Sequence, residues 1–257
     1  MVHFVYDGSF EGLLTAVFEV YERKAEKVRI IPAAQYQPDA FSEKIDVYND
    51  DAKANRVWKG LQRKVSVGAL TNIFSCYLSE RPDREELILS FCRMVFATDE
   101  KVEENFGSPV VLQLSQIGRQ LFREKHRFEA FVRFQQLQDG TFYASIDPDF
   151  NVIPLIISHF VQRYADQEWI IYDVQRKYGV HYDKKEVREV QFDFVPAGKH
   201  GETSPSIHDS REDLYQLLWQ SYFKSVNIPA RRNLKLHRKH VPLRYWKYLI
   251  EKQPGRR

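Results

Sequence analysis

The stretch FEAFVRFQQLQDGTFYASI, residues 128–146, decides the fold class of this chain. On both sides of the Asp139-Gly140 pair, apolar side chains recur at every second position, which is the period of a β-strand with one buried face. An Asp-Gly pair between two such runs is a strong signal for a tight hairpin turn. The stretch therefore predicts two antiparallel strands, over 128–134 and 142–146.

The sequence around this hairpin predicts further helices and strands. Apolar residues at three- and four-residue spacing predict helices over 50–66, 69–79 and 84–98, one from Ser108-Pro109 to about residue 125, and one over 153–164. Helices are also expected after Phe10, after Ser210 and after Pro242, with a loop over 196–209. Short alternating or apolar runs predict strands over 2–6, 28–31, 169–174, 180–182 and 186–194.

This order of elements predicts an α+β protein in two parts. Residues 1–107 form a mainly helical N-terminal part. Residues 108–257 form an α+β core with an antiparallel sheet built from hairpins, packed helices and a basic C-terminal segment. Runs of helices followed by runs of strands are typical of this class. With 257 residues, 43% of them hydrophobic, the chain has ample material for buried cores.

Composition and local patterns favour a cytoplasmic protein. No apolar run approaches the ~18–20 residues that span a bilayer. The opening MVHFVYDG lacks the basic and apolar regions of a secretory signal. The two cysteines, Cys76 and Cys92, fall in apolar helical patterns, so we expect buried thiols in a reducing compartment.

Charge is distributed unevenly along the chain. Residues 231–257 hold ten Lys and Arg residues and one acid, Glu251, so the net charge of this segment is +9. The whole chain has a net charge of +3, and the remaining residues therefore carry a net charge of −6. A basic end on an acidic body suggests an appendage that binds a polyanion, although a solvated basic helix end gives the same pattern.

Motifs for the common metal and cofactor classes are missing from the sequence. It has no C-x-x-C, no H-E-x-x-H and no glycine-rich phosphate loop. His237 and His240 are three apart, but the basic residues among them would repel a dication. We therefore predict no metal and no cofactor.

Polar residues on otherwise apolar elements are the candidates for catalysis. A histidine beside a carboxylate can act as an acid or base near neutral pH. His126 and Glu129 lie at the predicted helix-to-strand transition. His159 and Arg163 are four residues apart and so lie side by side on one predicted helix, and Asp173 lies at the end of a predicted strand. The candidate catalytic residues are His126, Glu129, His159 and Asp173, each of which has a structural alternative.

The C-terminal segment suggests nucleic-acid binding more directly. Lys and Arg neutralise phosphates, and flat aromatic rings stack on unpaired bases. Here basic residues alternate with Tyr245, Trp246 and Tyr248, although these rings are also needed for the apolar face of a helix. The predicted nucleic-acid contacts are Arg231, Arg232, Lys235, Arg238, Lys239, Arg244 and Lys247.

Five blocks of sequence together resemble a bacterial family of unknown function whose members are described as probable DNA-metabolism or DNA-repair proteins. The blocks are YDGSFEGLLTAVFEVYE (6–22), FEAFVRFQ (128–135), PDFNVIPLIISHFVQRYADQEWIIYD (148–173), RKYGVHYD (176–183) and VPLRYWKYL (241–249). The resemblance implies a radical-SAM protein, encoded beside such members, as a partner. Some members are fused to a uracil-DNA-glycosylase-like domain, and no glycosylase motif follows the basic segment here.

Three functions remain open at the level of sequence. The leading one is a nucleic-acid-binding accessory, with DNA as the expected ligand, that acts with a radical-SAM enzyme in DNA repair or modification. The second is a repair enzyme with its own glycosylase- or nuclease-like activity, which requires the four candidate residues to converge. The third is a protein-interaction scaffold whose basic segment docks on an acidic partner.

Overall fold

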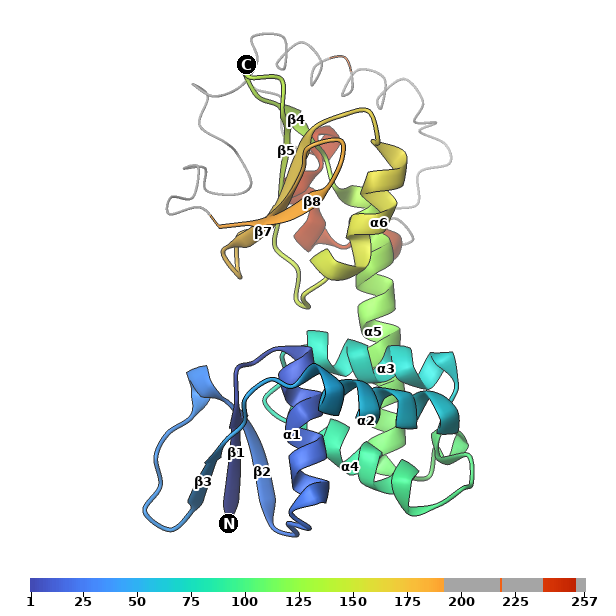
Figure 1. The fold of residues 1–257 in the computed structure, drawn as a ribbon. Coiled ribbons are helices and arrows are strands. Elements are labelled where there is room, and N and C mark those ends of the chain that lie inside the picture. The colour runs from blue at the N-terminus through green and yellow to red at the C-terminus, as the bar shows by residue number, and fades with distance from the viewer. Residues whose placement is uncertain (192–217, 219–237, 253–257) are drawn as a thin grey trace. The chain divides into compact units, whose positions relative to one another are not determined.

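The computed structural model describes residues 1–191, 218 and 238–252 (Figure 1). The chain forms two compact units, Met1–Phe122 and Arg123–Arg257, and helix α5 (Pro109–Phe131) runs from the first into the second. Each unit combines helices with its own sheet, which confirms the predicted α+β class.

The sheet of the first unit has three parallel strands in the order β2-β1-β3. β1 (Val2–Tyr6), α1 (Phe10–Glu22) and β2 (Val28–Pro32) form a β-α-β crossover. β3 (Glu43–Asp46) pairs with the other edge of β1. The sequence does not predict β3, because three of its four residues are charged and it lies at an exposed edge, where no apolar alternation develops.

The remaining helices of the first unit confirm the predicted helical pattern. They are α2 (Asp51–Lys64), α3 (Val67–Leu78) and α4 (Arg84–Ala97). Their apolar stripes pack with α1 in one hydrophobic core that includes Cys76 and Cys92. Both cysteines are buried free thiols, as predicted, and burial raises the pKa of each thiol to about 12.

The second unit has a five-stranded sheet in the order β4-β5-β6-β7-β8. The strands are β4 (Gln135–Gln136), β5 (Phe142–Ile146), β6 (Trp169–Asp173), β7 (Tyr178–Tyr182) and β8 (Val187–Val190). The prediction of an antiparallel sheet holds for every pairing except β5–β6, which is parallel. The reason is that α6 (Ile153–Arg163) connects these two strands as a crossover rather than a hairpin.

The strand predicted over 128–134 is wrong, because α5 continues to Phe131. Phe128 and Phe134 belong to the alternation seen in the sequence, but together with Phe131 they also have the spacing of three that fits one face of a helix. In the structure the rings of Phe128 and Phe131 each lie 5.4 Å from the ring of Tyr245, so one helix face packs on the C-terminal segment. Glu129, Phe131 and Arg133 therefore do not share one face of a strand.

The predicted hairpin turn is confirmed; its second strand, β5, has the predicted bounds, whereas its first strand, β4, follows the range predicted for it. The Leu137 N–H donates to the Thr141 carbonyl at 2.9 Å, and the Gly140 N–H donates to the Leu137 carbonyl at 3.0 Å. Gly140 adopts a φ of +89°, a left-handed conformation that favours glycine. The turn joins β4 to β5 and fixes their register.

The helix expected after Pro242 forms as two 3₁₀ helices, η4 (Leu243–Tyr248) and η5 (Ile250–Lys252). The helix predicted after Ser210 and the loop over 196–209 lie outside the described residues, Leu218 excepted. No helix within the described ranges is long and apolar enough to cross a membrane.

Candidate functional site

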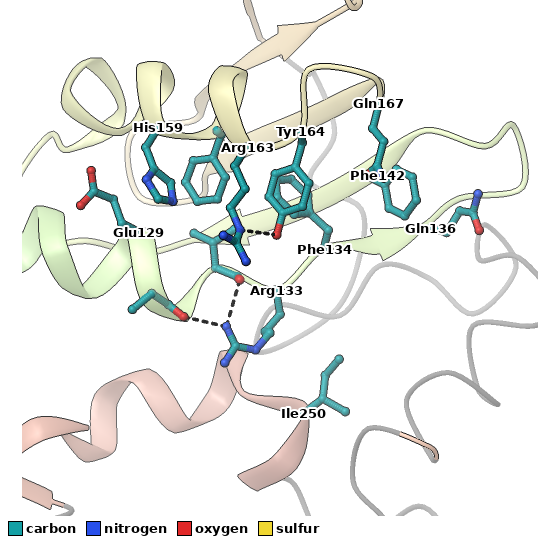
Figure 2. Close-up of a pocket in the computed structure, with 13 residues that line it drawn as sticks. Glu129, Arg133, Phe134, Gln136, Phe142, His159, Arg163, Tyr164, Gln167 and Ile250 are labelled. Carbon is teal, nitrogen blue, oxygen red and sulfur yellow. Dashed lines mark hydrogen bonds between the residues drawn. The ribbon is translucent and has the colours of Figure 1, made fainter. Parts of the chain in front are cut away.

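A cavity of about 890 Å³ lies in the second unit (Figure 2). Its walls come from the end of α5, the β4–β5 hairpin, α6 with the loop after it, and η5. Most ligand-binding clefts fall in the range of roughly 300–1,000 Å³. The side chains that give the cavity its chemistry are Glu129, Arg133, Phe134, Gln136, Phe142, His159, Phe160, Arg163, Tyr164 and Gln167.

The aromatic wall of the cavity is built around Phe134, which follows the end of α5. The centroid of its ring lies 5.6 Å from that of Phe160, 5.5 Å from that of Tyr164 and 6.2 Å from that of Trp169. Such mutual ring contacts hold each side chain in place before any ligand arrives. Trp169 is buried behind this wall, and its indole N–H has no hydrogen-bond partner among the described residues.

Arg133 is a fixed cation at the cavity. Its guanidinium donates to the Ala130 carbonyl at 2.8 Å and to the Val132 carbonyl at 3.2 Å, which satisfies carbonyl groups at the end of α5 (Figure 2). It also pairs with the buried carboxylate of Glu251 at 3.1 Å. Arg133 therefore joins η5 to α5, and much of its charge is compensated within the protein.

Arg163 is the more available cation. Its side chain is exposed at the end of α6, and its Nε donates only a long hydrogen bond, 3.4 Å, to the Tyr164 hydroxyl. The guanidinium lies 5.7 Å from the centroid of the Tyr164 ring, a cation–π contact that orients it without neutralising it. In the described part of the chain no carboxylate forms an ion pair with Arg163. It can therefore attract an anionic ligand.

The predicted residues Glu129 and His159 both line the cavity, so the structure brings two of the four catalytic candidates together. Figure 2 shows them on the same side of it, from α5 and α6. Glu129 forms an ion pair with Lys125 at 3.2 Å. The His159 ring packs edge-on against Phe160, with 5.1 Å between centroids. His126 is exposed on α5 and is not among the lining residues.

Asp173 belongs to a buried structural cluster instead. It is 0% exposed and forms an ion pair with Arg176 at 2.9 Å. Its other oxygen accepts the backbone N–H groups of Gln175 and Arg176, at 2.9 and 3.0 Å. Burial raises the pKa of the Asp173 carboxyl, and the Arg176 N–H groups and guanidinium oppose that shift. Asp173 does not line the cavity. These bonds fix the turn between β6 and β7.

Two of the predicted phosphate contacts are committed to internal ion pairs. Arg244 pairs with Glu124 at 3.2 Å and with Asp149, and Lys247 pairs with Asp147. Glu124 is only 2% exposed and also accepts the Asp149 backbone N–H at 2.8 Å. Burial raises the pKa of Glu124, while the Arg244 guanidinium opposes the shift. These pairs attach η4 to α5 and to the loop after β5.

The other predicted phosphate contacts divide into two groups. Arg238 and Lys239 are exposed ahead of η4. Arg231, Arg232 and Lys235 lie outside the described residues.

Most of the residues that line the cavity are not among the predicted site residues. The predicted site lacks Phe134, Phe142, Arg163, Tyr164 and Gln167, although the sequence places Arg163 beside His159 on one helix face. The four-residue step from His159 to Arg163 on α6 is the signal that points to this wall.

The comparisons with known proteins identify one family. A family model described as a domain of unknown function, DUF4130, matches residues 82–251, which is more than half of the chain. Searches of curated proteins and of solved structures found no match.

Proposed function

The chain belongs to the DUF4130 family, and we propose that it is a nucleic-acid-binding protein of DNA metabolism that acts as an accessory to an enzyme. The observation that carries this proposal is the composition of the cavity in the second unit. Aromatic rings, an arginine that no described carboxylate pairs with, and side-chain amides meet in one space large enough for a nucleotide.

Each of these groups matches one part of a single-stranded nucleic acid. Arginine attracts phosphate, aromatic rings stack on the faces of unpaired bases, and both interactions tolerate any base sequence. A duplex hides its base faces, so the chemistry of this cavity favours an unpaired nucleotide. Arg238 and Lys239 are exposed in the same unit and supply further positive charge for the backbone.

The proposed partner is a radical-SAM protein, and this part of the proposal rests on the family resemblance alone. In this arrangement the chain would hold or present a nucleotide while the partner performs the radical chemistry. The predicted absence of a cofactor in this chain agrees with such a division of labour.

A second candidate function is supported by the shared position of Glu129 and His159. A carboxylate and an imidazole at one cavity can transfer protons, as a glycosylase- or nuclease-like activity requires. Turnover of a damaged oligonucleotide by the chain alone would favour this candidate. A His159→Gln variant that keeps all of that turnover would contradict a role for the imidazole.

The proposed function is tested by fluorescence anisotropy with labelled single-stranded DNA, duplex DNA and RNA over a salt series. We expect single-stranded DNA to bind best, with an affinity that falls steeply between about 50 and 200 mM salt. A variant with Arg231, Arg232, Lys235, Arg238 and Lys239 replaced by Gln is expected to bind more weakly and with a smaller salt dependence.

Arg244 and Lys247 are left intact in that variant because their ion pairs attach η4 to the rest of the unit. Circular dichroism checks that the variant keeps its fold. Absence of binding at the lowest salt would overturn the proposed function. Co-purification with a partner protein in that case would favour the scaffold hypothesis.

A further inference from the structure

The polar groups of the cavity are not evenly distributed. Figure 2 shows one end of the cavity lined by Gln136, Gln167 and Phe142. The other end holds Glu129 and His159. We call the first group the amide end. A cavity with different chemistry at its two ends orients its ligand.

Backbone contacts fix the amide end. Gln136 and Phe142 are cross-strand partners in the β4–β5 pair. The Phe142 N–H donates to the Glu168 carbonyl at 2.9 Å. Gln167 comes directly before Glu168 in the chain, so this hydrogen bond places Gln167 beside β5. The three side chains are therefore held together by the sheet and by the loop after α6, before any ligand binds.

Arg163 lies between the two ends. His159 and Arg163 are one turn apart on α6, a separation of about 6 Å along the helix axis. Arg163 is next to Tyr164, whose ring is part of the aromatic wall. An anionic group bound by Arg163 would consequently be within reach of a ring system at the amide end.

We propose that this cavity is a subsite for one unpaired nucleotide of defined orientation. The base enters at the amide end, where its faces meet the rings of Phe142 and Tyr164 and its edge meets the amides of Gln136 and Gln167. The 5′-phosphate lies beside the Arg163 guanidinium. This inference rests on the proposed function, to which it adds a ligand class and an orientation.

The chemistry of the groups favours a nucleotide over other ligands. Each amide carries both hydrogen-bond donors and an acceptor, as the edge of every base does. Because an amide can match either pattern, we expect little preference among bases. An aliphatic ligand would offer the Gln167 amide no hydrogen-bonding edge, and a neutral aromatic ligand would form no ion pair with Arg163.

The test is isothermal titration of the full chain with deoxyadenosine monophosphate, deoxyadenosine and inorganic phosphate. We expect the nucleotide to bind tightest. Phe142→Ala is expected to weaken both the nucleotide and the nucleoside by about 5- to 150-fold, the range for loss of one base–ring stack. Arg163→Gln is expected to weaken the nucleotide and to leave the nucleoside unchanged.

Phe41→Ala is the matched control, because this phenylalanine is 92% exposed in the first unit. If Phe142→Ala fails to fold, Gln167→Leu tests the amide end from the loop after α6.

Equal losses of affinity for the nucleotide and the nucleoside in Arg163→Gln would overturn the orientation. Salt-sensitive binding of single-stranded DNA without any binding of the nucleotide would overturn the subsite and leave the proposed function standing. Binding of the nucleotide without binding of DNA would overturn the proposed function instead.

Discussion

Replacing Asp173 with alanine is expected to destabilise the second unit by about 3–5 kcal/mol, the usual cost of removing one partner of a buried ion pair. The change leaves the Arg176 guanidinium, which is 10% exposed, without its carboxylate. It also leaves two backbone N–H groups at the β6–β7 turn without an acceptor. Urea denaturation followed by far-ultraviolet circular dichroism measures the loss.

Asp173→Asn removes the charge of this side chain and keeps its shape. The amide oxygen can still accept both backbone N–H groups, so we expect a loss of about 1–3 kcal/mol, smaller than that of alanine. Asp166→Ala is the control, because Asp166 is exposed in the same unit, and we expect a change within about 0.5 kcal/mol. An alanine variant at 173 as stable as that control would contradict the structural role.

Reversing the charge of Arg163 is expected to weaken binding of single-stranded DNA by about 10- to 150-fold, the equivalent of one charge-assisted hydrogen bond. The glutamate in Arg163→Glu would also repel the neighbouring phosphates. One lost phosphate contact should reduce the slope of log affinity against log salt by about 0.7 for a single strand. Anisotropy over a salt series measures both effects.

Lys185→Glu is the matched control for this charge reversal. Lys185 is exposed in the turn between β7 and β8, it does not line the cavity, and its replacement changes the net charge by the same amount. We expect this variant to bind nearly as well as the unaltered chain. Equal losses for the two variants would mean that only net charge matters, and the cavity would have no specific part in binding.

Local sequence patterns predict much of the fold because the signals are strong and short in range. The Asp139-Gly140 turn and the apolar stripes of α3 and α4 follow from turn chemistry and helical spacing. The end of α5 is different, since the alternation from Phe128 to Phe134 fits a strand, while the spacing of Phe128, Phe131 and Phe134 fits a helix. In the helix, Phe128 and Phe131 pack on Tyr245, a contact between residues more than a hundred positions apart that local sequence patterns do not contain.

The candidate site was harder to predict, because its chemistry depends on which polar groups find partners in space. Residue type predicts Asp173 and Arg244 as site residues, yet both form ion pairs within the fold. Arg163 and His159 are four residues apart, a spacing that predicts neighbours on one helix face. Phe142 joins them only through the pairing of β5 with β6, which is a parallel contact that the sequence does not predict.

The most direct test of the central claim is photo-crosslinking of the full chain to single-stranded DNA that carries 5-iodouracil, with the attached peptides identified by mass spectrometry. If the cavity receives an unpaired base, crosslinks should form at Phe134, Phe142 or Tyr164, and an excess of unlabelled strand should suppress them. Crosslinks confined to the first unit, or to residues that do not line the cavity, would contradict the claim.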